Sequence, residues 1–404
     1  MLASILFPPR DSYVSDEGLR NLRLYKYSSI DKSPISYYIL RPYWEFCTTL
    51  FPMWLAPNLI TLLGFFFVLA NVAIAMIYTP DLETAGPSWI YFSFAIGIWL
   101  YSTFDNVDGK QARRTGSSSP LGELFDHGVD SLNCAFGALV QAAGLGMGLG
   151  WYTVLLVSMT IIVFFFSTWE NYHTGSLYLG YINGPTEGLI IACVMLCVSG
   201  VYGPDVWWQQ ISDALPSIGN LTPAGWTLMD LFLGGMLAMM AFTQVPISIY
   251  RVYETCKEKN KSVSEAMSQI GPFVVFMMSI YLWLGSPASH ILDTHLVAFV
   301  IATGLVFGRI ATAIILAHVT HMPYPTYWKL LTPVLFGTVI TNLPVFFQSG
   351  PILSATGEAI YLYLFLVYAV ASYLHWAVSV IDRFCTHLGI SCLTIPYRPL
   401  MTRP

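Results

Sequence analysis

Long apolar segments recur along most of this chain, and they constrain its fold more than any other feature. Several of them approach the roughly 20 residues that an α-helix needs to cross the hydrocarbon core of a bilayer. Only 10% of the 404 residues are charged, whereas an ordinary soluble domain has about 25%. We therefore expect an all-α polytopic membrane protein.

The apolar segments predict about ten transmembrane helices. They lie near residues 58–78, 88–105, 131–150, 152–168, 186–202, 225–246, 269–285, 294–317, 331–347 and 358–380. Before the first of them, the stretch from Pro34 to Pro52 combines clustered aromatic residues with Arg41 and Glu45. This combination is typical of an amphipathic helix at the membrane interface.

Basic residues are distributed unevenly among the connections between these spans. The connections near 79–87, 201–224, 285–293 and 348–357 contain no Lys or Arg, whereas the alternate connections contain several. Because positively charged loops stay in the cytosol, this pattern places both termini and the basic connections on the cytosolic side. The connection after the second span, with Lys110, Arg113 and Arg114, is among them.

Four aspartates are concentrated where the second and third spans reach this face. Asp105 and Asp108 follow one span, and Asp126 and Asp130 open the next. At about 100° per residue, the members of each pair lie within about 60° of each other around a helix, so each pair shares a face. Small residues on these faces, such as Gly109, leave room for a ligand.

The four carboxylates predict a site for divalent cations. Four negative charges at two opposed helix ends destabilise a fold unless cations neutralise them. Oxygen ligands suit Mg²⁺ or Mn²⁺ better than zinc, and two ions about 3.5 to 4 Å apart clamp the attacking and leaving oxygens in phosphoryl-type displacement. The alternative interpretation is a salt-bridged helix end at the membrane surface.

The complete pattern is specific enough to resemble a known family. The string Asp105-x2-Asp108-Gly109-x2-Ala112-Arg113-x8-Gly122-x3-Asp126-x3-Asp130 is similar to the signature of the CDP-alcohol phosphotransferase family at every defined position. The segments Tyr25–Ser28, Pro57–Thr61, Trp169–Gly175 and Asn183–Gly188 look like the eukaryotic cholinephosphotransferase and ethanolaminephosphotransferase branch. The alternative of a salt-bridged helix end does not explain so many fixed spacings.

The resemblance implies a reaction and a set of site residues. The sn-3 hydroxyl of diacylglycerol attacks the β-phosphorus of CDP-choline or CDP-ethanolamine, which gives phosphatidylcholine or phosphatidylethanolamine and releases CMP. Two Mg²⁺ or Mn²⁺ ions are bound by Asp105, Asp108 and Asp126, with Asp130 as a further ligand or as the base. The residues expected to contact the CDP moiety are Asn58, Asp105, Gly109, Lys110, Ala112, Arg113 and Gly122.

The residues themselves suggest a second candidate for the base. His127 shares a helical face with Glu123 and Asp130, and an unperturbed histidine titrates close to neutral pH. A metal-bound Asp130 is a poor base, so we hypothesise that His127, oriented by Glu123, takes the proton of the acceptor hydroxyl. The alternative is that His127 only packs or forms a hydrogen bond with Asp130.

Further polar residues lie at the cytosolic ends of the fourth and fifth spans. Three of them are candidates for recognising the amino-alcohol cation of the substrate or for supporting the metal ions: Glu170, His173 and Glu187. Trp169, Tyr172 and Tyr178 offer aromatic faces for a choline cation. His318 and His321, near the end of the eighth span, suggest a helix stop at the interface rather than a metal pair.

Three segments are expected: residues 1–52 as a cytosolic arm with the interfacial helix, 53–260 as the catalytic core and 261–404 as helices for dimerisation or lipid access. We expect a homodimer in the endoplasmic reticulum or Golgi membrane with its active site facing the cytosol, and no nucleic-acid partner. Two alternatives are a sister phosphatidyltransferase that uses CDP-diacylglycerol and an ion-coupled transporter. Transporters usually have inverted repeats, which this sequence lacks, and Arg309 alone is weak support for the phosphate pocket of the sister enzyme.

Overall fold

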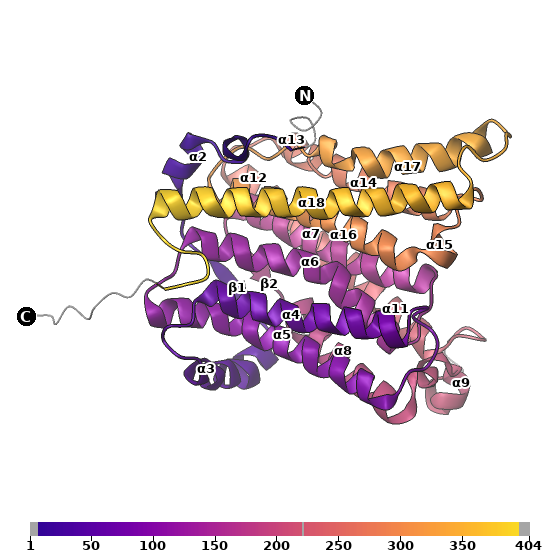
Figure 1. Cartoon of the computed structure of the whole chain (residues 1–404). Helices are drawn as coiled ribbons and strands as arrows, with labels where there is room; N and C mark the ends of the chain where they lie inside the picture. The colour runs from indigo at the N-terminus through magenta and orange to yellow at the C-terminus, as the bar shows by residue number, and fades with distance from the viewer. Residues whose placement is uncertain (1–6, 220–221, 396–404) are drawn as a thin grey trace, which may run out of the picture.

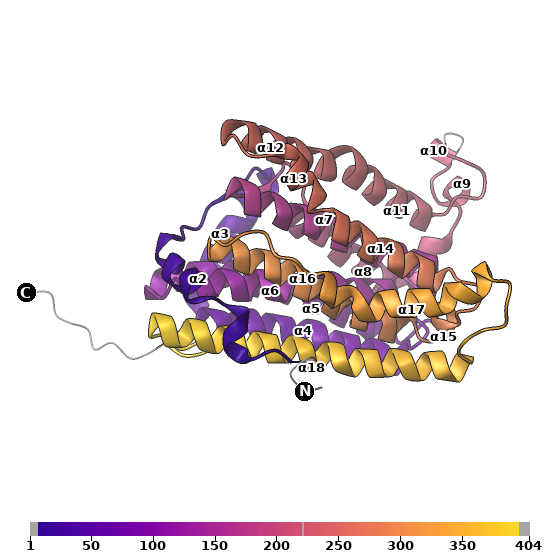
Figure 2. The same cartoon turned by 90° about the horizontal axis from the view of Figure 1, so that it is seen from above.

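The computed structural model, which describes residues 7–219 and 222–395, is a bundle of long helices that run roughly parallel to one another (Figures 1 and 2). Eight helical segments of the described residues are long and apolar enough to cross a membrane. They are α4 (Pro57–Tyr78), α7 (Trp151–Thr174), η4 with α8 (Gly184–Tyr202), α11 with η6 and α12 (Leu228–Glu258), α13 with α14 (Val263–Leu284), α16 (Leu296–Val319), α17 (Trp328–Phe346) and α18 (Ala355–Leu388). The chain is therefore an all-α polytopic membrane protein, as predicted.

Two more long helices, α5 (Ser88–Thr115) and α6 (Pro120–Gly144), carry the four aspartates. The predicted count of about ten crossings depends on them, and that count and the positions of the termini stay predictions. The remaining short elements are η1 (Arg10–Tyr13), α2 (Asp16–Asn21), η2 (Leu22–Leu24), β1 (Ser29–Asp31), η3 (Ser36–Leu40), α3 (Arg41–Leu50), β2 (Leu177–Leu179), η5 (Pro204–Trp208), α9 (Ile211–Ala214), α10 (Pro216–Gly219) and α15 (Ile291–Thr294).

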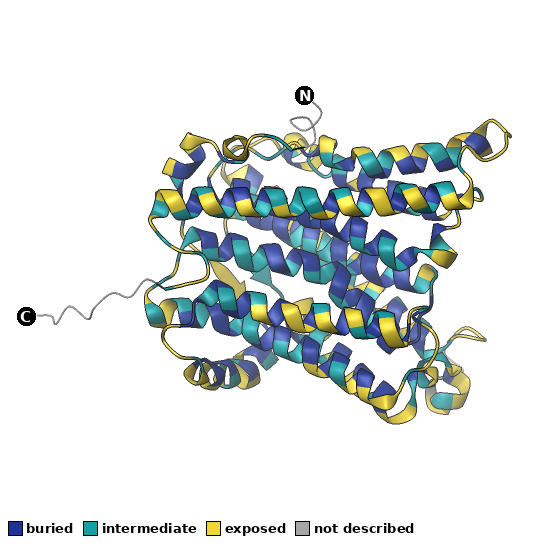
Figure 3. Ribbon diagram, in the orientation of Figure 1, coloured by how far each residue is buried: buried dark blue, intermediate teal, exposed yellow. Residues whose placement is uncertain are grey.

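The packing core is centred on α6 and α16 (Figure 3). In the most apolar stretch of α16, 83% is buried, compared with 11% in the corresponding stretch of the peripheral segment formed by α11, η6 and α12. Glycines let the two central helices approach closely, because a Cβ on Gly304 would lie 2.5 Å from the Cβ of Ala135 and one on Gly308 would lie 2.7 Å from Leu132 Cδ2. A side chain at Gly304 would therefore force the two helices apart, because the Cβ of Ala135 cannot move independently of its backbone.

The hairpin between α5 and α6 positions the acidic residues. Helix α5 continues beyond the predicted span at 105 and ends at Thr115, where Gly116 adopts the left-handed conformation with φ 65°. Ser119 then caps α6 by accepting a hydrogen bond from the amide of Gly122. The span predicted at 131–150 was placed too late, since α6 begins at Pro120 and glycines with positive φ follow its end. All four aspartates are therefore helical.

The arm before α4 packs on the bundle at several points. Helix α3 has two different faces, because Trp44 and Cys47 are buried while Phe46 is 63% exposed and the side chain of Glu45 is 70% exposed. Its place at the membrane interface stays a prediction. Strand β1 pairs in parallel with β2, which follows α7. Farther upstream, the hydroxyl of Tyr13 lies 3.1 Å from Nδ1 of His375 in α18. Residues 1–6 of the predicted arm lie outside the described residues.

Candidate metal and nucleotide site

Three of the four predicted aspartates converge at the end of the bundle where α5 ends and α6 begins. Carboxylate oxygens of Asp105, Asp126 and Asp130 all lie within 4.8 Å of one another. Asp108 lies one turn beyond Asp105 on α5 and is buried. Oxygens this close repel one another when all the carboxylates are ionised, so the arrangement requires positive charge or shared protons.

The donor set fits divalent metal ions. Asp105 Oδ1 and Asp126 Oδ1 are buried and accept no hydrogen bond from the described residues. Buried carboxylate oxygens without a partner are costly unless a cation binds them. Carboxylates alone favour Mg²⁺, Mn²⁺ or Ca²⁺ over softer metals. The family resemblance and the geometry thus agree on this cluster as the candidate metal centre.

Two hydroxyl groups that sequence reasoning missed hold the acids in place. Tyr101 donates a hydrogen bond to Asp130 Oδ1, and Thr61 donates one to Asp108 Oδ2. A signal for Tyr101 was present, since it precedes Asp105 by four residues and therefore shares its helical face. Thr61 comes from α4, and only the packing of α4 against α5 brings it to Asp108.

The residues expected to contact CDP gather beside this cluster. A Cβ on Gly122 would lie 3.9 Å from Oδ1 of Asn58, so α4 and α6 meet at the predicted nucleotide position. Gly109 leaves similar space, because a Cβ there would lie 3.7 Å from the guanidinium of Arg113. Arg113 is exposed and interacts electrostatically with Asp108, which leaves its guanidinium accessible to a diphosphate. Ala112 is half-buried on the same helix.

The structure gives different partners to the other two basic residues of α5. The ammonium of Lys110 lies 3.5 Å from the carboxylate of Glu45 in α3. Arg114 donates hydrogen bonds to the carbonyl oxygens of Thr48 and Phe51, at 2.9 Å and 2.8 Å. Both cations therefore connect α3 to α5. Lys110, which we expected to contact CDP, is directed to Glu45 instead.

The predicted base, His127, lies beside the acids. Its Nε2 is 3.9 Å from Oδ2 of Asp126. Glu123, which was expected to orient His127, approaches a different histidine: its Oε1 lies 3.8 Å from Nε2 of His318 in α16. The sequence could not reveal this contact, because His318 comes from a distant helix.

Two of the three candidate head-group residues are engaged by structural contacts. Glu170 Oε1 lies 2.7 Å from Nε of Arg251, and Oε2 accepts a hydrogen bond from Ser248 at 2.7 Å. His173 Nε2 lies 2.8 Å from the side-chain oxygen of Gln269. These contacts connect α7 to α12 and to the residue after α13. The charge of Glu170 is thus already matched by a cation of the protein.

The third candidate, Glu187, closes a local turn. It accepts hydrogen bonds from the amide of Asn183, at 2.9 Å, and from the hydroxyl of Ser33. The predicted aromatic cage is also dispersed, because Trp169 is buried in the core and the guanidinium of Arg251 covers the ring of Tyr178 at 4.0 Å. The structure therefore does not gather these residues around one empty position.

The N-terminal arm adds Tyr27, which sequence reasoning did not single out by itself. The pKa of the Tyr27 hydroxyl is raised, first by the loss of hydration in its surroundings and further by the negative charges of Asp126 and Asp105. The side chain is nevertheless 56% exposed. Tyr27 is therefore an exposed side chain close enough to the acidic cluster to interact with its charges.

Long apolar helices and a buried cluster of carboxylates at one end of the bundle define a polytopic membrane protein with a candidate divalent-metal centre. Residues 54–215 match the family model described as CDP-alcohol phosphatidyltransferase. The chain belongs to the CDP-alcohol phosphatidyltransferase family.

Similar proteins extend this relationship over nearly the whole chain. The chain is 34% identical to choline/ethanolaminephosphotransferase 1 of Arabidopsis thaliana, over 95% of this chain and 98% of that protein. It is 36% identical to cholinephosphotransferase 1 of Saccharomyces cerevisiae, over 85% and 89% of the two chains. Identity to human ethanolaminephosphotransferase 1 is 32%, over 94% and 93%. Identity therefore continues well beyond the matched family domain.

Proposed function

We propose that this protein transfers phosphocholine, phosphoethanolamine or both from the CDP-alcohol to diacylglycerol, giving phosphatidylcholine or phosphatidylethanolamine and CMP. The observation that carries the proposal is the convergence of carboxylate oxygens of Asp105, Asp126 and Asp130 within 4.8 Å at one end of the helical bundle. The names of the relatives from three kingdoms, all cholinephosphotransferases or ethanolaminephosphotransferases, support the choice of donor.

The four aspartates would hold two Mg²⁺ or Mn²⁺ ions. When bound, such ions neutralise the diphosphate and stabilise the charge that develops on the leaving oxygen. The guanidinium of Arg113 is available to bind the diphosphate as well, since Lys110 and Arg114 are directed to α3. Asn58 and the space left by Gly109 and Gly122 would accommodate the nucleotide.

The transfer needs one proton acceptor near the acids. A base takes the proton of the sn-3 hydroxyl, the hydroxyl oxygen bonds to the β-phosphorus, and the bond from that phosphorus to the bridging oxygen breaks, so that CMP leaves. We propose His127 as this base. Asp130 is less suited, because the hydroxyl of Tyr101 donates to it and a metal-bound carboxylate is weakly basic.

Other parts of the proposal concern cellular context and organisation. We propose that the acidic end of the bundle faces the cytosol, from which a water-soluble CDP-alcohol can reach it. We also propose that the enzyme resides in the endoplasmic reticulum or Golgi membrane. The positive-inside distribution of Lys and Arg supports this orientation. The three-segment division at residues 52 and 260 and the homodimer stay predictions.

Turnover by the purified, detergent-solubilised protein tests the function. We expect lipid product, detected by mass spectrometry, when Mg²⁺, diacylglycerol and either CDP-choline or CDP-ethanolamine are supplied. A chelator should abolish it. Activity only with CDP-diacylglycerol and a soluble alcohol would assign the protein to the sister reaction and overturn the proposal.

A control variant separates metal binding from catalysis. Mn²⁺ should raise the unfolding temperature of the wild type, because a ligand that binds only the folded state stabilises it. The same concentration should have little effect on Asp126→Ala. An equal shift in both proteins would place the metal elsewhere.

A further inference from the structure

A second histidine reaches the acidic end of the bundle from the C-terminal half of the chain. Nε2 of His318, near the end of α16, lies 3.8 Å from Oε1 of Glu123 in α6. Both side chains are well shielded, with 12% of His318 and 5% of Glu123 exposed. The imidazole and the carboxylate are therefore both largely removed from water where they approach each other.

Other polar groups surround this pair. The side chain of Asn171, in α7, interacts with Glu123. The ring of Tyr25, from the N-terminal arm, packs edge-on against His318 with ring centroids 6.4 Å apart. The hydroxyl of Tyr25 is buried and has no hydrogen-bond partner among the described residues. Buried polar groups are normally paired, so this hydroxyl is available to bind a further polar group.

This polar cluster adjoins the proposed transfer site. Glu123 precedes His127 by one helical turn, so the two side chains share a face of α6. The rings of His127 and His318 are also near enough to interact electrostatically. The cluster is therefore on the same face as the proposed base, whereas Asn58 and Gly122 mark the nucleotide position.

We propose that His318 is a positioning residue for the acceptor side of the reaction. Its imidazole lies beside Glu123 and holds that carboxylate in place on the face of α6 where the acceptor hydroxyl meets His127. The inference rests on the proposed function, and it extends the site beyond the aspartate motif into α16. The class of ligand it serves is a lipid with a free primary hydroxyl.

His321 provides a matched control. It follows His318 by three residues but lies past the end of α16, where its backbone has φ 50° and its side chain is exposed. Its amide donates to the carbonyl oxygen of His318 at 3.1 Å, and its exposed imidazole interacts electrostatically with His318 but is not among the groups that act on Glu123. Loss of the imidazole at this position should therefore leave turnover unchanged.

The test compares His318→Phe, His318→Gln and His321→Phe, with kcat and KM measured separately for both substrates. His318→Phe should lower kcat about tenfold or more, because the phenyl ring offers Glu123 no polar partner and the carboxylate loses its position. KM for the CDP-alcohol should change less than about twofold, because the nucleotide contacts are intact. Glutamine keeps a polar N–H group at this position, so His318→Gln should recover most of kcat.

Three results would overturn the inference: wild-type kcat in His318→Phe, equal loss in the phenylalanine and glutamine variants, or a rise in KM for the CDP-alcohol that accounts for the loss. Unfolding temperatures with and without Mn²⁺ show whether each variant is folded. Should His318→Phe unfold, a double-mutant cycle of His318→Ala with Glu123→Gln replaces it, and independent effects would refute the pairing. An inactive wild type would instead refute the proposed function.

Discussion

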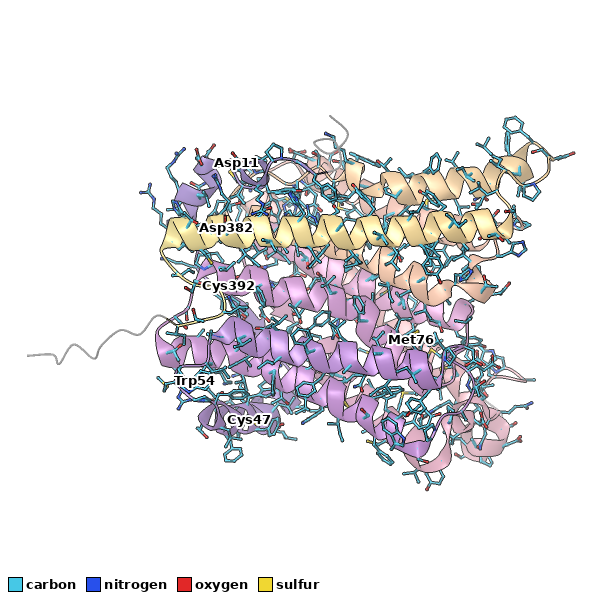
Figure 4. All side chains as sticks on the ribbon, in the orientation of Figure 1. Asp11, Cys47, Trp54, Met76, Asp382 and Cys392 are labelled. Carbon is cyan, nitrogen blue, oxygen red and sulfur yellow. The ribbon has the colours of Figure 1, made fainter. Side chains whose placement is uncertain are left out.

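Asn58 at the start of α4 and Cys392 in the C-terminal tail are joined by a hydrogen bond, from Nδ2 to Sγ, of 3.6 Å, although they lie 334 positions apart. Helix α18 ends at Leu388, and Gly389, with φ 65°, turns the chain back across the end of the bundle. Cys392, labelled in Figure 4, therefore reaches the ends of α4 and α6. The tail thus contacts a residue of the proposed nucleotide site.

Alkylation of Cys392 should consequently inhibit turnover, because a bulky adduct would push into the space around Asn58. Burial raises the pKa of the Cys392 thiol above its usual value. Since only the thiolate reacts, labelling by N-ethylmaleimide should be slow at neutral pH and faster as the pH rises. CDP with Mn²⁺ should protect the thiol, as measured by mass spectrometry of the labelled peptide.

Cys392→Ser is the matched control, as its hydroxyl can still accept from Asn58. This variant should retain activity and resist the reagent. Equal inhibition of the serine variant, or labelling that CDP does not slow, would mean that the tail is remote from the nucleotide.

Arg113 and Lys110 should differ sharply in their effect on donor binding. Arg113→Ala should raise KM for the CDP-alcohol roughly tenfold to a hundredfold, because a charge-assisted hydrogen bond to phosphate is lost. Lys110→Ala should change it less than about threefold, since Lys110 pairs with Glu45, whose side chain is 70% exposed. Steady-state kinetics with varied CDP-choline give both values. Similar effects of the two substitutions would show that the ammonium of Lys110 leaves Glu45 to bind the substrate.

His127→Ala should lower kcat at least tenfold, because general bases typically contribute about a hundredfold or more. Stabilisation by Mn²⁺ should persist, as the substitution leaves every carboxylate in place. The rate of product formation at saturating substrates measures the effect. A loss of less than tenfold would reject His127 as the base and direct attention to Asp130.

We predict that the ion pair between Glu170 and Arg251 stabilises the fold and does not determine specificity for the head group of the substrate. Arg251→Gln leaves a buried carboxylate without its cation and should cost about 2 kcal/mol of unfolding free energy. Adding Glu170→Gln should recover much of that loss. Thermal unfolding of the two single variants and the double variant measures the coupling.

The ratio of activity with CDP-choline to activity with CDP-ethanolamine should be the same in wild type and the double variant. A change in this ratio would indicate that Glu170 contacts the head group of the substrate. It would also mean that Arg251 moves away when the substrate binds.

The sequence by itself determined those features that depend on regular patterns within single helices. Apolar length predicted the membrane helices, since hydrophobic thickness sets helix length. Helical periodicity placed Asp105 with Asp108 and Asp126 with Asp130, because residues three and four apart share a face. The same spacing identified the family, which the comparisons confirmed. Each of these conclusions depends only on neighbours along one or two helices.

Only the tertiary structure decided which side chains meet across helices. Four polar residues had side chains suited to binding substrate or metal, yet contacts with other helices or loops already engage them. They are Lys110, Glu170, His173 and Glu187. Conversely, Thr61, His318 and Cys392 reach the acidic end of the bundle from distant segments. The physical reason is that helical periodicity fixes the face on which a residue lies, whereas the packing of one helix against another determines what that face contacts.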